Sequence, residues 1–211
     1  ISSPKRMFKK IIYEFIIKFS LKFYNWVLCV SPSPTSSLVN SISFSKKVET
    51  LPWGVSQDYI NFPIKSTSYK YHLVFLGRPN SQKLQIATIR HIINLFKIQK
   101  IVSDTRNIDL AFIVPNLNSH LKFIQKTIKE EYGCSIKTYI SLDDYSVAEV
   151  LLKSLYSFNC FEWEAYGLSY VESLCMGCNV ILPNTSPIIP VIDLKKDSPV
   201  FKLNLSKNPN H

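Results

Sequence analysis

Tyr71-His-Leu-Val-Phe-Leu76 is a continuous apolar run, and Asp109-Leu-Ala-Phe-Ile-Val114 is a second one. Runs of this kind are typical of strands that are covered on both faces, as in parallel sheets. Residues 86–96, which lie between them, place isoleucine and phenylalanine at helical spacing. A strand, a helix and a second buried strand form a βαβ unit, so the sequence predicts a mostly parallel sheet.

The alternation of strands and helices continues beyond this unit. Apolar spacing predicts a helix around 121–128, a short strand at 136–140, a helix at 147–151 and a strand at 179–182. Short connections join these segments. The predicted fold class is therefore α/β, a Rossmann-like, mostly parallel sheet with helices on both faces.

The composition indicates a globular protein with an anionic partner. The 211 residues are 46% hydrophobic and 19% charged, which excludes a disordered chain. Lys and Arg number 25 against 15 Asp and Glu, giving a net charge of +10. This charge suits a nucleotide, a nucleic acid or an acidic lipid, and it does not choose among them.

The cysteines indicate reduced thiols. Five is an odd number, and the chain lacks the composition of a disulfide-rich secreted domain. Cys175-Met-Gly-Cys178 has the spacing of a zinc or redox pair, but no second such pair or histidine pair accompanies it. We interpret these two cysteines as small buried residues.

Residues 5–26 are apolar at helical spacing and rich in lysine. Lys18 and Lys22 interrupt any uncharged span long enough to cross a bilayer. The segment is either a helix packed on a domain with a basic outer face, which we favour, or a basic amphipathic helix on an anionic membrane surface.

Two carboxylates bracket a glycine turn in the segment from Glu162 to Ile181. Glu164 and Glu172 lie on either side of Gly167, and a helix is expected to begin at this turn. Backbone N–H groups at a helix start favour phosphate, and carboxylates accept hydrogen bonds from sugar hydroxyls. The segment predicts a sugar-nucleotide site. The alternative is that Ser169-Tyr-Val-Glu172 forms a capping box, in which Glu172 bonds the helix's own amides.

The chain resembles glycosyltransferase family 4, the retaining enzymes of GT-B fold, and in particular their C-terminal, donor-binding domain. The resemblance runs from Val30-Ser31 through Leu51-Pro-Trp-Gly-Val55, Phe62-Pro63, Phe75-Leu-Gly-Arg78 and Lys83 to Glu164-Ala-Tyr-Gly-Leu168, Glu172 and Gly177-Cys-Asn-Val-Ile181. These motifs agree with the family in order and in spacing.

The resemblance implies roles for the residues of the glutamate segment. Glu164 would orient the transferred sugar, and Glu172 would hold the ribose hydroxyls. Tyr166, Gly167 and Leu168 would offer backbone amides.

It also implies that the loop after the first strand of the domain, with Gly77, Arg78 and Lys83, reaches the diphosphate. The two cations would stabilise the charge on the departing diphosphate, so no metal and no cofactor is expected. The donor would be a UDP-sugar or a GDP-sugar.

The sequence departs from the family at several positions. Ala165 stands where relatives have glycine, and Pro115-Asn-Leu-Asn118 replaces a glycine-rich turn and removes an amide donor. A glycine common near the nucleobase is here Ile140. We therefore place the base near Tyr139 to Ser141 and leave its identity open.

The resemblance also implies a domain organisation. Residues 1–45 are expected to be the end of an N-terminal, acceptor-side domain with the interdomain linker, and 46–211 a nucleotide-sugar-binding domain truncated at its end. The acceptor would be a glycan, lipid-linked or protein-linked. We expect a cytoplasmic protein, with a peripheral position at the cytoplasmic face of a membrane as the alternative.

Other functions are compatible with the same fold. A GT-B enzyme such as a nucleotide-sugar epimerase explains Glu164 and residues 166–168 less well. A non-catalytic nucleotide-sugar-binding module would keep the site without the transfer reaction. We do not expect a nucleic-acid partner, because the aromatic residues lie in apolar runs and not among exposed cations.

Overall fold

The computed structural model describes residues 12, 15, 16, 19, 23, 26–29, 47–51, 54–63, 68–80, 84–158, 167–183 and 200–203. The chain forms two compact units, Ile1–Trp53 and Gly54–His211. Most of the described residues belong to the second unit.

The first unit contains two paired strands and an apolar helical segment. β1 (Trp26–Cys29) and β2 (Lys47–Thr50) run parallel. Ahead of them, Ile12, Phe15, Ile16 and Phe19 are helical, and their side chains are 42–69% exposed. This is the predicted apolar stripe, facing solvent. No helix among the described residues combines the length and the apolar character needed to span a bilayer.

The second unit alternates helices with strands along most of its length. Its elements, in chain order, are α3 (Gln57–Ile60), β3 (Tyr71–Leu76), α4 (Ile86–Ile98), the 3-10 turn η1 (Thr105–Asn107), β4 (Asp109–Val114), α5 (Ser119–Tyr132), β5 (Ser135–Ile140), α6 (Asp144–Leu152), β6 (Ser154–Phe158), α7 (Leu168–Cys175), β7 (Asn179–Pro183) and β8 (Val200–Leu203).

The strands form one six-stranded sheet in the order β5-β4-β3-β6-β7-β8. Every pairing in this sheet is parallel. From β3, the chain adds β4 and then β5 on one side. It then crosses back to β6, which lies on the other side of β3, and adds β7 and β8 beyond it. This is the strand order of a doubly wound, Rossmann-like sheet.

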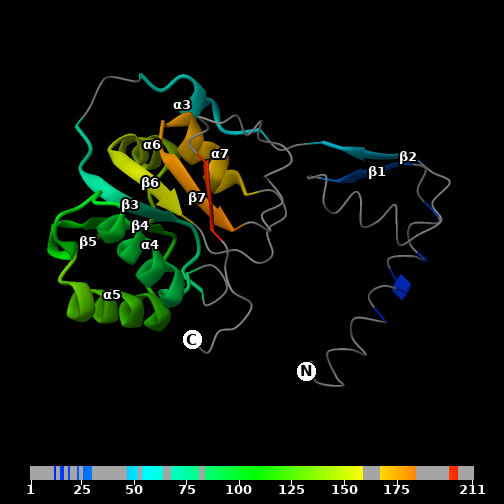
Figure 1. Cartoon of the computed structure of the whole chain (residues 1–211). Helices are drawn as coiled ribbons and strands as arrows, with labels where there is room; N and C mark the ends of the chain where they lie inside the picture. The colour runs from blue at the N-terminus through cyan, green and yellow to red at the C-terminus, as the bar shows by residue number, and fades with distance from the viewer. Residues whose placement is uncertain are drawn as a thin grey trace. The chain divides into compact units, whose positions relative to one another are not determined.

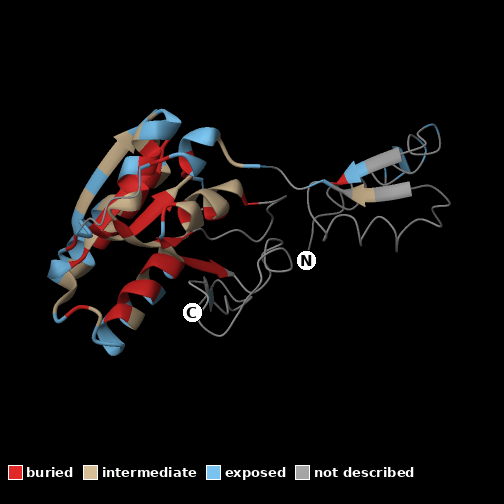
Figure 2. Cartoon of the chain, turned by 90° about the horizontal axis from the view of Figure 1, so that it is seen from above, coloured by how far each residue is buried: buried red, intermediate tan, exposed pale blue. Residues whose placement is uncertain are grey.

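Helices cover both faces of the sheet. α4 and α5 lie against one face, and α6 and α7 against the other (Figure 1). The first face carries Leu73 and Phe75 in a cluster with Ile93 of α4 and Ile124 of α5. The second carries Val74 and residues of α3 and α6. The buried residues gather in the strands and on the sides of the helices that face them (Figure 2).

The structure confirms the predicted α/β fold and corrects the element list. The strands predicted at 71–76, 109–114, 136–140 and 179–182 are present within one residue. The three predicted helices are present but longer than predicted, since α5 ends four residues later and α6 begins three residues earlier. β6, in the middle of the sheet, and β8 were not predicted. β6 has the sequence Ser-Leu-Tyr-Ser-Phe, which breaks the apolar run expected of a buried strand.

Hydrogen bonds explain how serines occupy a central strand. Ser154 and Ser157 are both fully buried. The Ser154 hydroxyl donates to the Val150 carbonyl at 2.7 Å. The Ser157 hydroxyl lies 2.8 Å from that of Ser173 on α7, and Ser173 lies 2.7 Å from the Ser169 carbonyl. A hydroxyl has one proton, so Ser173 donates to the carbonyl and Ser157 donates to Ser173. This bond fixes α7 on β6.

The order of donors predicts unequal effects of removing the two hydroxyls. Ser157→Ala removes a donor and leaves Ser173 bonded, so it should lower the free energy of unfolding by about 1 kcal/mol. Ser173→Ala leaves the buried Ser157 proton without its acceptor and should cost about 1–3 kcal/mol. Chemical denaturation of both variants and of the double variant is the measurement. Equal and additive losses would show that the two hydroxyls are not bonded in this direction.

Candidate functional site

The strand order itself marks a site. The chain reverses its direction of winding between β3 and β6, which are neighbours in the sheet. In open parallel sheets, ligands bind outside the carboxyl ends of the strands where the winding reverses, because the two following loops diverge there. The loops after Leu76 and after Phe158 leave the sheet at this point. Both loops belong to the segments that the sequence predicted as the site.

The loop after β3 begins with Gly77 and Arg78. The Gly77 N–H donates to the Ile113 carbonyl at 3.0 Å, which keeps the first residue of the loop on the sheet edge. Its φ of 147° lies in a region that side chains other than glycine adopt only with strain. The turn sends Arg78 into solvent, where its side chain is exposed.

Two side chains at the N-terminal end of α5 are hydrogen bonded to Pro79 and Leu84, which lie before and after residues 80–83 in the sequence. Asn118 is the N-cap of α5, and its Oδ1 accepts from the Leu121 N–H at 2.8 Å. Its Nδ2 donates to the Pro79 carbonyl at 2.7 Å. His120 lies 2.8 Å through Nε2 from the Leu84 carbonyl, so Nε2 is the donor. Asn118 and His120 therefore hold Pro79 and Leu84, the residues before and after the 80–83 segment.

Sequence reasoning missed Asn118 and His120. It treated Pro115–Asn118 as the loss of a glycine-rich turn, whereas the segment ends in a capping residue with a second function. An Asn directly before an apolar helical pattern is an N-cap signal and could have indicated the first bond. No sequence signal indicates the bonds to Pro79 and Leu84, which join residues far apart in the chain.

The loop after β6 leads to the N-terminus of α7. Gly167 is its N-cap, buried, with φ 84° in the left-handed region where glycine is favoured. Within the part of the chain that the structure describes, no side chain caps this helix. The N-terminal end of a helix attracts anions through its amides and its dipole. Gly167 and Leu168 therefore lie at an end of the helix where anions are electrostatically favoured.

The helix start removes the alternative role for Glu172. In a capping box Ser169 would be the N-cap and Glu172 the third helical residue. α7 begins at Leu168, so Glu172 is its fifth residue and its carboxylate lies a turn beyond the first amides. The capping-box alternative is wrong.

Glu172 lies in a partly buried acidic environment. Burial, and next the nearby charge of Asp144 on α6, raise the pKa of Glu172 to about 7. Burial together with Glu172 and Asp144 also raises the pKa of Tyr59 on α3. Three helices bring these groups together from distant parts of the sequence. Among the described residues, no cation or hydrogen-bond donor is bound to the Glu172 carboxylate.

Tyr139 bonds within the protein. Its hydroxyl is hydrogen bonded to that of Tyr71, and the two rings meet edge-on with centroids 6.2 Å apart. Lys137 lies 5.9 Å from the Tyr139 ring centroid. Ser141 follows β5 with its hydroxyl on the Pro115 carbonyl at 2.7 Å. The Tyr139 hydroxyl is thus already hydrogen bonded within the protein. The backbone at Ile140 and Ser141 lies at the carboxyl end of β5.

Three predicted site residues lie outside the described residues. These are Lys83, Glu164 and Tyr166. The residues on either side of their segments are described, and they place the segments after β3 and after β6. The roles of the three side chains stay predictions.

The cysteines of the described part are free thiols. Cys29, Cys134, Cys175 and Cys178 form no disulfide. The Cys178 thiol donates to the Leu151 carbonyl at 3.0 Å, and burial raises its pKa to about 12, so it is a protonated, packed residue. In the described ranges, no three His, Cys, Asp or Glu side chains come together as a metal site.

The fold is shared with solved glycosyltransferases. The GtfA/B complex superposes with a TM-score of 0.65 at 13% identity, over 92% of this chain and 36% of that one. The pneumococcal O-GlcNAc transferase GtfA, solved with UDP and GlcNAc, gives 0.61 at 13% identity, over 82% and 33%. Sucrose-phosphate synthase from Thermosynechococcus elongatus gives 0.63 at 14% identity, over 89% and 47%.

The likeness is one of fold. These neighbours are GT-B glycosyltransferases, and the chain has the Rossmann-like α/β architecture of their domains. It spans about a third to a half of their length. Neither the protein-family models nor the curated proteins include a match.

The environment of Glu172 predicts a pH-dependent stability. Between its ordinary pKa of 4.5 and about 7, the folded protein holds a proton that the unfolded chain has lost. Stability therefore falls as pH rises through this window, and the loss is complete above it. Glu172→Gln should raise the free energy of unfolding by about 2–3 kcal/mol at pH 8 and by little near pH 4.5.

Denaturation of both proteins across this pH range measures the difference. Glu149→Gln, at an exposed position of the neighbouring α6, is the matched control and should leave the profile unchanged. Parallel profiles for the Glu172 variant and the parent would contradict the buried, uncompensated carboxylate.

Proposed function

We propose that the chain is the donor-binding part of a retaining glycosyltransferase, which moves a hexose from a nucleotide-diphosphate sugar to a glycan, lipid-linked or protein-linked acceptor. The observation that carries the proposal is the convergence, at the reversal between β3 and β6, of Gly77 and Arg78 with the start of α7. A cation and a helix N-terminus on one sheet edge suit a diphosphate.

Each part of the donor has a complementary group. Arg78 and Lys83 bind the diphosphate, together with the amides at Gly167 and Leu168, and Gly77, whose own N–H is bonded to the Ile113 carbonyl, provides the turn that leads to Arg78. Glu172, one turn into α7, accepts hydrogen bonds from the ribose hydroxyls, which satisfies a carboxylate that has no donor among the described residues.

The remaining parts of the donor lie at the two ends of this site. The base stacks or bonds near Tyr139 to Ser141, at the end of β5. Tyr166 and Glu164 lie toward the transferred sugar. One structural neighbour was solved with UDP and GlcNAc, which have the chemistry that this arrangement suits.

The reaction needs stabilisation of a departing diphosphate. When the bond between the anomeric carbon and the phosphate oxygen breaks, negative charge accumulates on that oxygen. Arg78 and Lys83 stabilise this charge more in the transition state than in the ground state. Glu164 orients the sugar so that the acceptor hydroxyl attacks from the face that the diphosphate leaves. The acceptor is bound by a second domain, since the chain spans about a third to a half of its structural neighbours.

A non-catalytic nucleotide-sugar-binding module is the second candidate, because the described site supports binding of the donor by itself. An epimerase of GT-B fold is a third. Transfer of labelled sugar to an acceptor distinguishes the first proposal from both, in a protein that includes the acceptor-side domain. Glu164→Ala should then abolish transfer and retain donor binding.

Ligand-induced stabilisation tests the donor site directly. UDP, GDP and their sugar conjugates are compared by thermal denaturation. A ligand at a hundredfold excess over its dissociation constant adds about 2.7 kcal/mol, a rise in Tm of roughly 5–10 °C for a chain of this size. Arg78→Ala, Lys83→Ala and Glu172→Ala should each reduce the rise, whereas Lys97→Ala on α4 should retain it. A chain that is folded but stabilised by none of the ligands would remove the donor-site assignment.

Binding of the selected nucleotide sugar should also depend on pH. The ribose hydroxyls need the ionised form of Glu172, whose pKa is about 7. Its ionised fraction rises roughly tenfold from pH 6 to pH 8, so affinity should rise by about the same factor. The diphosphate diester does not titrate in this range. Calorimetry with the parent and Glu172→Gln measures the effect, and the variant should show weak, pH-independent binding. A flat profile for the parent would exclude Glu172 from the ribose site.

A further inference from the structure

A basic groove lies at the edge of the sheet, between α5 and β5. Its volume is about 570 Å³. The lining residues, from α5, from β5 and from the turn between them, are Lys122, Gln125, Lys126, Lys129, Cys134, Ser135, Ile136 and Thr138. None of the groups assigned to the donor site lines it.

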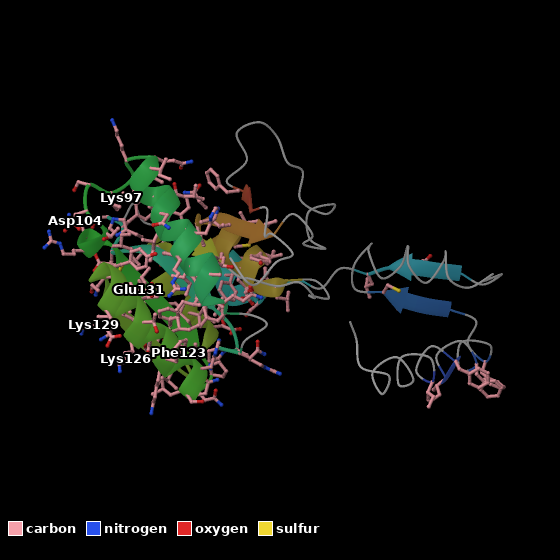
Figure 3. The ribbon with its side chains drawn as sticks, turned by 60° about the horizontal axis from the view of Figure 1, so that its bottom comes forward. Lys97, Asp104, Phe123, Lys126, Lys129 and Glu131 are labelled. Carbon is pink, nitrogen blue, oxygen red and sulfur yellow. The ribbon has the colours of Figure 1, made fainter. Side chains whose placement is uncertain are left out.

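The charge of the groove is positive throughout. Lys122, Lys126 and Lys129 recur along one side of α5 and are exposed, and no carboxylate is among the lining residues. Lys126 and Lys129 lie close together on α5 in Figure 3, apart from Lys97. The nearest acidic partner, Glu130, is 3.8 Å from Lys126 at an exposed position. A pair of this kind neutralises little charge.

Glu131, in the last turn of α5, is paired with another helix and does not line the groove. Glu131 forms a two-pronged ion pair with Arg90 of α4. Like charges three and four residues apart destabilise a helix, so the lysine row is unfavourable unless anions approach it. The groove therefore has an electrostatic preference for an anionic partner.

The floor of the groove is an open strand. β5 is the first strand of the sheet and pairs with β4 through all six residues, Ser135–Ile140. Within the described ranges, no strand pairs with its outer edge. The edge presents backbone N–H and C=O groups to a further extended chain. Backbone pairing of this kind is how strand addition recognises peptides.

The spacing of the lysines matches an added strand. In a strand, alternate side chains point to the same face and recur about every 6.6–6.8 Å. Lys122 and Lys126 are four residues apart on α5, which is about 6 Å along the helix axis. Alternate side chains of an added strand on the α5 face would therefore meet Lys122 and Lys126, whereas Lys129, about 4.5 Å beyond Lys126 along the axis, adds positive charge without this match.

We propose that the outer edge of β5 binds an extended acidic peptide of a partner protein as a seventh strand, with alternate Asp or Glu side chains on the lysines of α5. Hydrogen bonds to the backbone of β5 set the register of the peptide, and the lysines favour acidic side chains on it. Lysines also protect edge strands from unwanted pairing, and this protective role predicts no peptide affinity.

The test uses the whole chain and a fluorescent peptide that alternates Glu and Thr. Fluorescence anisotropy gives its Kd. Replacing all three lysines by alanine should raise the Kd at least about tenfold, the sum of three exposed ion pairs. Lys97→Ala, Lys100→Ala and the two combined are the matched controls, since these exposed lysines do not line the groove and should leave the Kd unchanged.

Two further peptides separate the components of the site. N-methylation of every second amide removes backbone donors at constant charge and should abolish binding when it falls on the edge-facing amides. A peptide with the same residues but the Glu grouped at one end should bind more weakly. Equal binding of the methylated, grouped and alternating peptides, or displacement by heparin and oligonucleotides alone, would overturn the strand-addition proposal in favour of general anion attraction. Absence of binding would leave the lysines a protective role.

Discussion

The pairing of β3 with β6 is the constraint on which the rest of the structure depends. These strands are joined through two complete strand and helix repeats, and their parallel register from Tyr71 with Ser154 to Phe75 with Phe158 brings both chain segments to the same edge. Without this pairing, the loop of Arg78 and the start of α7 would have no common location. The serine bond between β6 and α7 then determines where the helix begins relative to the strand.

Three groups determine the electrostatic properties of the sheet at the carboxyl ends of β3 and β6. The site combines an exposed arginine, an uncapped helix start and a partly buried glutamate whose pKa is raised by burial and by Asp144. A folded protein tolerates an unfavourable carboxylate when a ligand supplies donors to it, and functional sites are where such shifts concentrate. In the proposed function, the cost to stability and the binding of ribose hydroxyls have one physical origin at Glu172.

The sequence predicts the parts of this structure that depend on neighbouring residues. Apolar runs identified β3, β4 and β7, and helical spacing identified α4 to α6, because these patterns reflect the burial of one segment. β6 escaped detection because two serines interrupt its apolar run, and one of them, Ser157, is satisfied by Ser173, a partner 16 residues along the chain that a local pattern does not contain. The same limit applies to the site. Gly77, Arg78 and Glu172 follow from motifs, whereas Tyr59, Asp144 and His120 reach it only through tertiary contacts.

Asn118 illustrates how such a tertiary contact limits the substitutions that a position can accept. Its carbonyl oxygen caps α5 while its amide nitrogen holds Pro79. Asp and Ser can perform the first task, as N-caps generally do, but a carboxylate has no proton for a carbonyl, and a single hydroxyl oxygen would have to reach both the Leu121 N–H and the Pro79 carbonyl, which Asn contacts through two separate atoms. Gln has both groups, but its longer side chain makes it a poor N-cap. Mutational drift at this position is therefore confined to a single amino acid for as long as both bonds are required.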